Sequence, residues 1–247
     1  MAKPRHLEKA PITEAVIDFR ANLTRDFNLD KISSLKEELF NEYPNCKPIK
    51  VNEFIFGLEG DQPIKKNLEQ LVGYRLETQD GKNVAQFRLD GFTFSRLAPY
   101  TEWKKVFGEA RRLWEIYVAK ASPESVTRIA TRYINQLRLP FSTSDFSQYL
   151  TVPPIIPDTL PRITNFLIRV SICEPASDIK ANITQAFQMG TDPSDHVIII
   201  LDIDAFKTGS FVVTESGMWD TFEALRNMKN RIFFEMITED TARLYEV

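Results

Sequence analysis

One order of secondary-structure elements is predicted twice along the chain. Residues 14–121 are typical of a strand, a helix, a four-stranded meander and a long amphipathic helix, and residues 126–238 repeat this order. A supersecondary unit that recurs in this way predicts two copies that share one core. We therefore expect an α+β fold made of two tandem β-α-β4-α halves, residues 1–122 and 123–247, which can also count as a single domain. The halves are expected to form one continuous antiparallel sheet with the long helices on one face.

The repeat is visible in the residues themselves. Residues 14–23 align without gaps with residues 128–137, which places Phe19 on Tyr133. The two closing helices also align when one residue is deleted, and each has a tryptophan close to its start. Identity between the halves is low, so the prediction depends on element order and on the spacing of apolar residues.

Two Asp-Gly pairs predict the register of the first meander. Asp-Gly, found at residues 80–81 and at residues 90–91, is a favoured two-residue hairpin turn. The second turn predicts that Leu89 lies opposite Phe92. An apolar stripe that recurs every three or four residues along residues 103–118 predicts a helix that covers the apolar face of this meander. The residues expected on that face are Tyr74, Leu76, Ala85, Phe87, Leu89, Phe92 and Phe94.

Composition bounds the class of protein. The 247 residues are 43% apolar and include 18 phenylalanines, which is enough for a sizeable core. The formal net charge of −3 does not favour general binding to nucleic acid or to anionic membranes. The chain has two cysteines, Cys46 and Cys173, and no apolar run long enough for a membrane span. We therefore expect a cytoplasmic protein without membrane contact.

Three short motifs resemble one protein family. Residues 9–15 read Lys-Ala-Pro-Ile-Thr-Glu-Ala, residues 94–103 contain Phe-Ser-Arg-Leu followed by a tyrosine and a tryptophan, and residues 131–135 read Thr-Arg-Tyr-Ile-Asn. In this order the motifs resemble a sporadically distributed family of uncharacterised bacterial proteins of about this length. The resemblance implies a bacterial cytoplasmic protein and implies no catalytic residues. The patchy distribution of that family suggests an association with defence genes.

The order of elements also resembles the duplicated saddle of TATA-binding-protein-like folds. This is an analogy of fold and implies no function. It does imply that the first strands of the two halves are neighbours at the centre of the sheet, with both long helices behind it.

The polar face of the sheet is the predicted binding surface. If the first strands are neighbours, Asp18 can pair with Arg132, and Arg20 and Arg128 are left free. The residues then available to a protein partner or an acidic ligand are Arg20, Arg128, Arg132 and Gln136. The simplest alternative is a solvated face whose arginines pair with neighbouring acids. We expect a non-catalytic binding or adaptor protein of unknown pathway.

Two further functions stay open. Asp202 and Asp204, two residues apart on a predicted strand, point to one face and can hold a divalent metal for phosphoryl-transfer or nuclease chemistry. Glu174 or Glu215 would supply a third ligand. The same arginines could instead bind a nucleic-acid backbone, which the net charge does not favour. The chain lacks a Gly-x-Ser-x-Gly turn and a glycine-rich phosphate loop, so the sequence leans against an enzyme and predicts no cofactor.

One predicted strand needs a cover on both sides. Residues 197–201 are all apolar, and Ile198 and Ile200 share a face with Asp202. The proline-rich residues 152–161 are the expected cover, and the other half or a second molecule are the alternatives. A homodimer is therefore compatible with the sequence.

Overall fold

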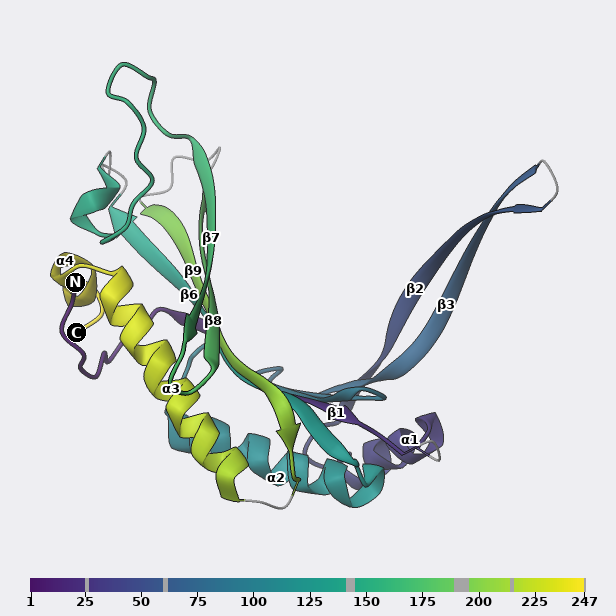
Figure 1. Cartoon of the computed structure of the whole chain (residues 1–247). Helices are drawn as coiled ribbons and strands as arrows, with labels where there is room; N and C mark the ends of the chain where they lie inside the picture. Colours follow the sequence, from purple (N-terminus) through teal and green to yellow (C-terminus); the bar gives the residue numbers. More distant parts are fainter. Residues whose placement is uncertain (25–26, 60–61, 141–144, 189–195, 214–215, 247) are drawn as a thin grey trace.

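A computed structural model describes most of the chain. The described residues are 1–24, 27–59, 62–140, 145–188, 196–213 and 216–246, without the side chains of residues 53–59, 62–67, 188, 196 and 216. Within them, nine strands form one antiparallel sheet in the order β2-β3-β4-β5-β1-β6-β9-β8-β7 (Figure 1). The strands are β1 (Ile12–Asn22), β2 (Asn45–Glu59), β3 (Gln62–Glu77), β4 (Asn83–Arg88), β5 (Gly91–Leu97), β6 (Ser125–Pro140), β7 (Asn165–Glu174), β8 (Ile179–Gln188) and β9 (His196–Phe211).

Two of the short helices begin at residues whose side chains accept hydrogen bonds from the first amide groups. Asn28 caps the first helix, because its side chain accepts hydrogen bonds from the amides of Asp30 and Lys31. Thr238 caps the last helix in the same way through the amide of Thr241. The helices are α1 (Leu29–Glu38), α2 (Trp103–Ala121), the 3-10 turn η1 (Phe146–Gln148), α3 (Ser216–Met236) and α4 (Glu239–Arg243).

Aromatic rings join the two long helices to the centre of the sheet. Phe19 of β1 is fully buried, and its ring centroid lies 4.2 Å from that of Trp114 in α2 and 5.0 Å from that of Phe222 in α3. Phe107 of α2 lies 5.3 Å from Phe222 by the same measure, so the helices also touch each other. Such ring pairs add to the free energy gained by burying their area. The core therefore lies between the sheet and α2 and α3.

The first strands of the two predicted halves are neighbours, as the sequence predicts. β1 pairs with β6 antiparallel, with Ile17 opposite Thr131 and Asp18 opposite Ala130. β1 also pairs with β5 on its other side, so it has a neighbour along both edges. One antiparallel sheet thus runs through the whole chain, and the prediction of an α+β fold is confirmed.

The first predicted hairpin has the expected register. Leu76 lies opposite Ala85, and Tyr74 lies opposite Phe87. Leu76, Ala85 and Phe87 are fully buried, which confirms that this side of the meander is the apolar one. The Asp-Gly turn and the alternation of apolar residues were therefore sufficient to predict this register.

The second predicted hairpin has a different register. Phe92 lies opposite Phe87, and the prediction that it faces Leu89 is wrong. Gly91 belongs to strand β5 rather than to the turn, and its φ is 143°. A Cβ atom on Gly91 would lie 2.0 Å from the carbonyl oxygen of Phe19. Glycine is therefore needed here for the close approach of β1 to β5, and not for the turn.

The second half has a shorter meander than predicted. Three described strands follow β6, namely β7, β8 and β9, where four were expected. The reason is that β9 continues through Gly209 to Phe211 along the edge of β6, so no hairpin forms at this glycine. The expected β-α-β4-α order is thus wrong for the second half.

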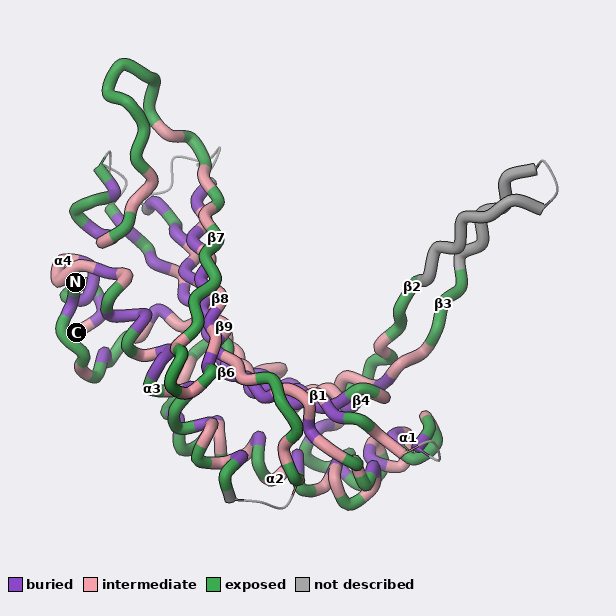
Figure 2. The backbone as a smooth tube through the Cα atoms, in the orientation of Figure 1, coloured by how far each residue is buried: buried purple, intermediate pink, exposed green. Residues whose placement is uncertain are grey.

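The proline-rich segment does not cover β9. Figure 1 shows this part of the chain rising beyond the end of β7, and Figure 2 shows much of it exposed. Ile155 is 89% exposed, and Ile198, which it was expected to help cover, is 37% exposed. The prediction that residues 152–161 pack over this strand is therefore wrong.

Candidate binding face of the sheet

One side of the sheet has no helix of the described residues over it (Figure 1). Figure 1 shows a strongly curved sheet in which the β2–β3 hairpin and the β7–β9 strands rise on the same side, away from the long helices. The uncovered side is therefore concave, and we call it the open face. Because side chains alternate along a strand, the neighbours of the buried residues point to this face.

A nearly buried carboxylate lies at the centre of the open face. Asp18 is 8% exposed. Its oxygens accept a hydrogen bond from the hydroxyl of Thr93 at 2.6 Å and one from Arg128 at 2.9 Å. The guanidinium nitrogens of Arg20 and Arg88 lie 3.4 Å and 3.5 Å from it. Asp18 thus contacts three arginines, one each from β1, β4 and β6, and its negative charge offsets part of their positive charge.

On one side of Asp18 the contacts continue toward the edge of the sheet. Arg128 also donates to both oxygens of Asp204, at 3.0 Å and 2.9 Å, and its guanidinium lies 4.7 Å from the ring centroid of Phe206. Asn182 of β8 donates to Asp204 at 3.4 Å, and Ser171 of β7 donates to Asn182 at 2.8 Å. Two strands beyond β9 are therefore connected to the same set of polar groups.

On the other side of Asp18, the polar contacts end at Asp90. It accepts hydrogen bonds from Arg20 at 2.6 Å and from Arg88 at 3.0 Å. Asp90 lies in the turn between β4 and β5 and is mostly exposed, whereas Asp18 is not. We call the connected polar groups the open-face network, which consists of Asp18, Arg20, Arg88, Asp90, Thr93, Arg128, Ser171, Asn182 and Asp204.

A separate ion pair lies beside this network. Arg132 donates to both oxygens of Asp202, at 2.8 Å and 2.5 Å. These hydrogen bonds raise the pKa of Arg132. The Arg132 side chain is 48% exposed. Gln136, four residues further along β6, is half-buried and faces the same side.

The predicted pairing of Asp18 with Arg132 is wrong. Asp18 lies opposite Ala130 in the ladder, and the arginine that reaches it is Arg128. Arg132 instead pairs with Asp202 of β9. The sequence did not indicate that β9 lies beside β6. Consequently Arg20 and Arg128 are not free, and Arg132 is the most exposed of the four predicted binding residues.

The charges at the centre of the open face are balanced. Four arginines, Arg20, Arg88, Arg128 and Arg132, contact four aspartates, Asp18, Asp90, Asp202 and Asp204. The centre of the open face is therefore polar, and its arginines are matched by aspartates. The planar guanidinium of arginine can donate to both oxygens of a carboxylate, so these arginines are still suited to recognise an acidic group.

The carboxylates proposed for a metal are both engaged by arginines. Asp202 and Asp204 do point to one face, as predicted, but each accepts two hydrogen bonds from a guanidinium. Glu174 pairs with Arg231 at 3.0 Å, and Glu215 lies outside the described residues. Across the described part of the chain, no three His, Cys, Asp or Glu side chains are grouped to hold a metal ion. A cation would have to displace both arginines.

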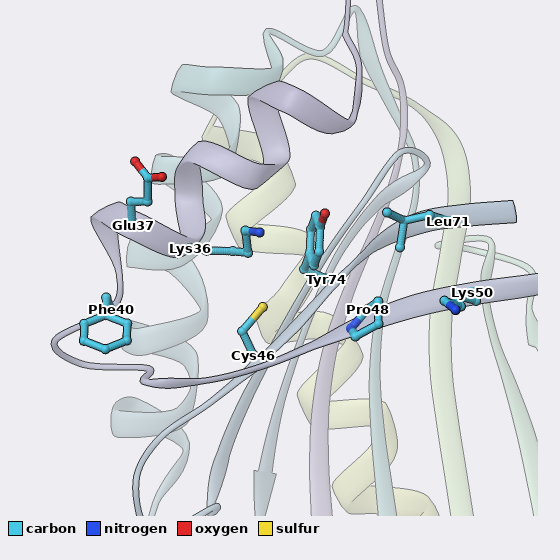
Figure 3. A pocket seen from close by; sticks show the side chains of 8 residues that line it. All are labelled: Lys36, Glu37, Phe40, Cys46, Pro48, Lys50, Leu71 and Tyr74. Carbon is cyan, nitrogen blue, oxygen red and sulfur yellow. The ribbon is translucent and has the colours of Figure 1, made fainter.

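A hollow of about 700 Å³ lies on the other side of the sheet, between α1 and the base of the β2–β3 hairpin (Figure 3). Phe40 is mostly exposed and lines this hollow. The ammonium of Lys36 lies 4.2 Å from the ring centroid of Tyr74. Burial raises the pKa of the Cys46 thiol, which makes it a poor nucleophile at neutral pH. The residues that line the hollow are Lys36, Glu37, Phe40, Cys46, Pro48, Lys50, Leu71 and Tyr74.

A buried lysine lies among the aromatic residues of the core. Lys229 of α3 lies 3.5 Å from the ring centroid of Tyr133. Burial, reinforced by the nearby charge of Arg226, lowers the pKa of Lys229 to about 7. The hydroxyls of Tyr133 and Tyr100 are 3.2 Å apart beside it. Because this lysine has so little contact with solvent, we interpret it as part of the core.

A scan against models of protein families found no family that matches the chain, and a search of curated proteins found no match either. The resemblance to a bacterial family therefore stays a prediction. No helix in the described part of the chain has the length and apolar character needed to cross a membrane.

Proposed function

We propose that the protein is a non-catalytic binding protein that receives a protein partner on its open face. The observation that supports this most is the open-face network itself. It extends from the β4–β5 turn to β7 over a concave surface on which none of the described helices lies. Polar groups that already hold one another in place form a rigid surface, and a rigid surface loses little entropy when it binds.

The charge balance favours a protein over a nucleic acid as the partner. A nucleic-acid backbone is bound through an excess of lysine and arginine that replaces its counterions. Each of the four arginines at the centre of the open face instead has an aspartate neighbour. A protein segment can offer acidic and basic groups together, which suits a surface of alternating charge.

Arg132 is the residue most suited to contact the partner. It is the most exposed arginine of the four on the open face, and its guanidinium presents further N–H groups beside Asp202. Gln136 on the same strand adds an amide that can both donate and accept. We propose that an acidic side chain of the partner binds Arg132 from the solvent side while Asp202 holds the guanidinium in place.

We also propose that the sheet consists of two tandem halves with the long helices on one face. Outward from the centre, the strand order is β1-β5-β4-β3 on one side and β6-β9-β8-β7 on the other. Phe19 contacts both Trp114 and Phe222, which supports the placement of α2 and α3 on the same side. The strand β2 has no equivalent among the described residues of the second half.

The test compares two arginines of equal exposure. Arg132→Glu changes the open face, and Arg231→Glu changes the exposed side of α3, where Arg231 is 51% exposed and paired with Glu174. The tagged wild type and both variants are used to recover bound proteins from the native cells. We expect a partner that is lost with Arg132→Glu by more than about tenfold and retained with Arg231→Glu, the size typical of a lost interfacial charge pair.

Circular dichroism melting of the three proteins supplies the fold control. Equal retention of the partner by two folded variants would contradict the proposal, and so would loss of the partner with Arg231→Glu alone. Recovery of DNA or RNA in place of a protein, sensitive to Arg132→Glu, would support the nucleic-acid alternative instead.

A further inference from the structure

The sheet has two edges, and only one of them is protected against pairing. The edge strand β2 contains Pro48, which has no amide hydrogen to donate, and a shift of register between Ile49 and Lys50. Lys47 and Lys50 add charges along the same edge. Proline, lysine and irregular register are the devices by which proteins prevent a sheet edge from joining another chain.

The opposite edge strand, β7, has none of these devices. It pairs with β8 over ten successive residues without a shift of register, and it contains no proline and no lysine. Its large apolar side chains are exposed: Leu167 and Val170 by about half or more, and Ile172 by about a third. No described residue other than those of β8 pairs with its backbone in the sheet. An open, regular and apolar edge of this kind favours the addition of a strand.

We propose that β7 pairs antiparallel with β7 of a second copy of the chain, about a twofold axis at Val170. Residues opposite one another in an antiparallel ladder share a face of the sheet. With Val170 opposite itself, Ile168 of each copy lies opposite Ile172 of the other. Ile168, Val170 and Ile172 share one face of β7 and would then form one continuous apolar strip across the two copies.

Charge favours this register over the one centred on the preceding residue. An axis at Arg169 would place the two Arg169 side chains directly opposite each other. With the axis at Val170, Arg169 of each copy lies opposite Ser171 of the other, and no like charges meet within the strand. The sequence of β7 is thus complementary to itself in this register, which is the property that an isologous dimer requires. This self-complementarity favours a second copy over an unrelated strand.

The dimer does not depend on the proposed function. An antiparallel strand added in the plane of the sheet covers neither face, so the open-face network stays accessible in both copies. The two open faces would lie on the same side of an eighteen-stranded sheet, because a twofold axis normal to the sheet preserves its faces.

The first test uses two exposed valines, one on each edge strand. Val170 of β7 is 48% exposed and Val51 of β2 is 51% exposed. Sedimentation velocity over a range of concentrations is measured for the wild type, Val170→Arg and Val51→Arg. We expect the wild type and Val51→Arg to form dimers, and Val170→Arg to be monomeric at concentrations at least tenfold higher, because two arginines would meet at the axis. A wild type that stays monomeric, or a dimer that survives Val170→Arg, would overturn the proposal.

The second test fixes the register by disulfide formation. In a Cys46→Ser/Cys173→Ser background, which removes the two exposed thiols, Val170→Cys should oxidise to a covalent dimer. Directly opposite residues have Cα atoms about 4.5–5.5 Å apart, within the range of a disulfide. Ile168→Cys alone should not cross-link, since four residues of strand, roughly 13 Å, separate the two copies of residue 168.

A mixture of Ile168→Cys and Ile172→Cys should cross-link in the same background. Cross-linking of Ile168→Cys with itself, together with failure of Val170→Cys, would show that the chains pair in another register or through another surface and would overturn the assignment of the axis.

Discussion

The same strands place apolar side chains on one face of the sheet and charged side chains on the other. In β1, Phe19 points to the helices and is surrounded by aromatic rings, while its neighbour Asp18 points to the open face and is surrounded by arginines. The covered face buries apolar area, which supplies most of the free energy of folding. On the open face, hydrogen bonds between charged side chains fix their positions, although none of the described helices lies above them. The comparison shows that side chains on an uncovered face can be held in place by polar contacts instead of by apolar packing.

The largest expected effect lies on the covered face. Trp114→Ala removes a fully buried ring that stacks on Phe19 at 4.2 Å. We expect the free energy of unfolding to fall by about 3–5 kcal/mol, measured by urea unfolding. Phe40→Ala, at an exposed ring in the hollow beside α1, should change it by less than about 0.5 kcal/mol. Similar losses for the two variants would contradict the placement of the core.

A second effect on the covered face depends on pH. The pKa of Lys229 is about 7 in the folded protein and close to 10.5 in an unfolded chain. Between these values the unfolded chain holds a proton that the folded protein lacks, so the wild type should become more stable as the pH rises from 7 to 9. The slope is at most about 1.4 kcal/mol per pH unit.

Lys229→Met should remove this slope, since methionine cannot take up the proton. Urea unfolding of both proteins at several pH values below 9, where tyrosine ionisation is small, checks the expectation. An identical pH dependence in the two proteins would show that Lys229 is charged in the fold.

On the open face, the expected effect depends on burial within one network. Asp18→Ala would leave Thr93 and three arginines without their common acceptor, and should lower the free energy of unfolding by about 1–3 kcal/mol. Asp90→Ala removes a carboxylate from the same network at its exposed end and should cost less than about 1 kcal/mol. Chemical denaturation measures both, and equal costs would mean that Asp18 is not the centre of the network.

At Arg132 we expect a small effect on stability and a large effect on partner binding. Arg132→Gln removes an exposed ion pair and should change the free energy of unfolding by less than about 1 kcal/mol. Partner binding should nevertheless fall strongly. A variant that unfolds would instead indicate that Arg132 serves the fold rather than the partner, and thermal melting distinguishes the two outcomes.

Local signals in the sequence predicted the covered face better than the open face. The first Asp-Gly turn and the alternation around it were enough to place Leu76 opposite Ala85, because turn and pattern act over a few residues. The second turn was misplaced since Gly91 is required by the backbone of a distant strand, β1. Short-range patterns do not contain that contact.

The open face depends on which strands become neighbours. Asp18 and Arg132 could be placed on one face from the sequence, but their partners, Arg128 and Asp202, follow from the ladders of β6 with β1 and β9. A shift of four residues along β6 would exchange Arg128 for Arg132 at the same carboxylate. The predicted site residues were therefore brought to one surface, while the pairing among them was not predicted.

Site-specific photo-cross-linking tests the open face as a binding surface most directly. A photoreactive phenylalanine analogue is placed at Gln136 on the open face and, in a second protein, at Arg231 on α3, and both are irradiated in native cells. Our account predicts a covalent adduct with a partner protein from position 136 and none of that partner from position 231. The same adduct from position 231 alone, or no protein adduct from position 136, would contradict it.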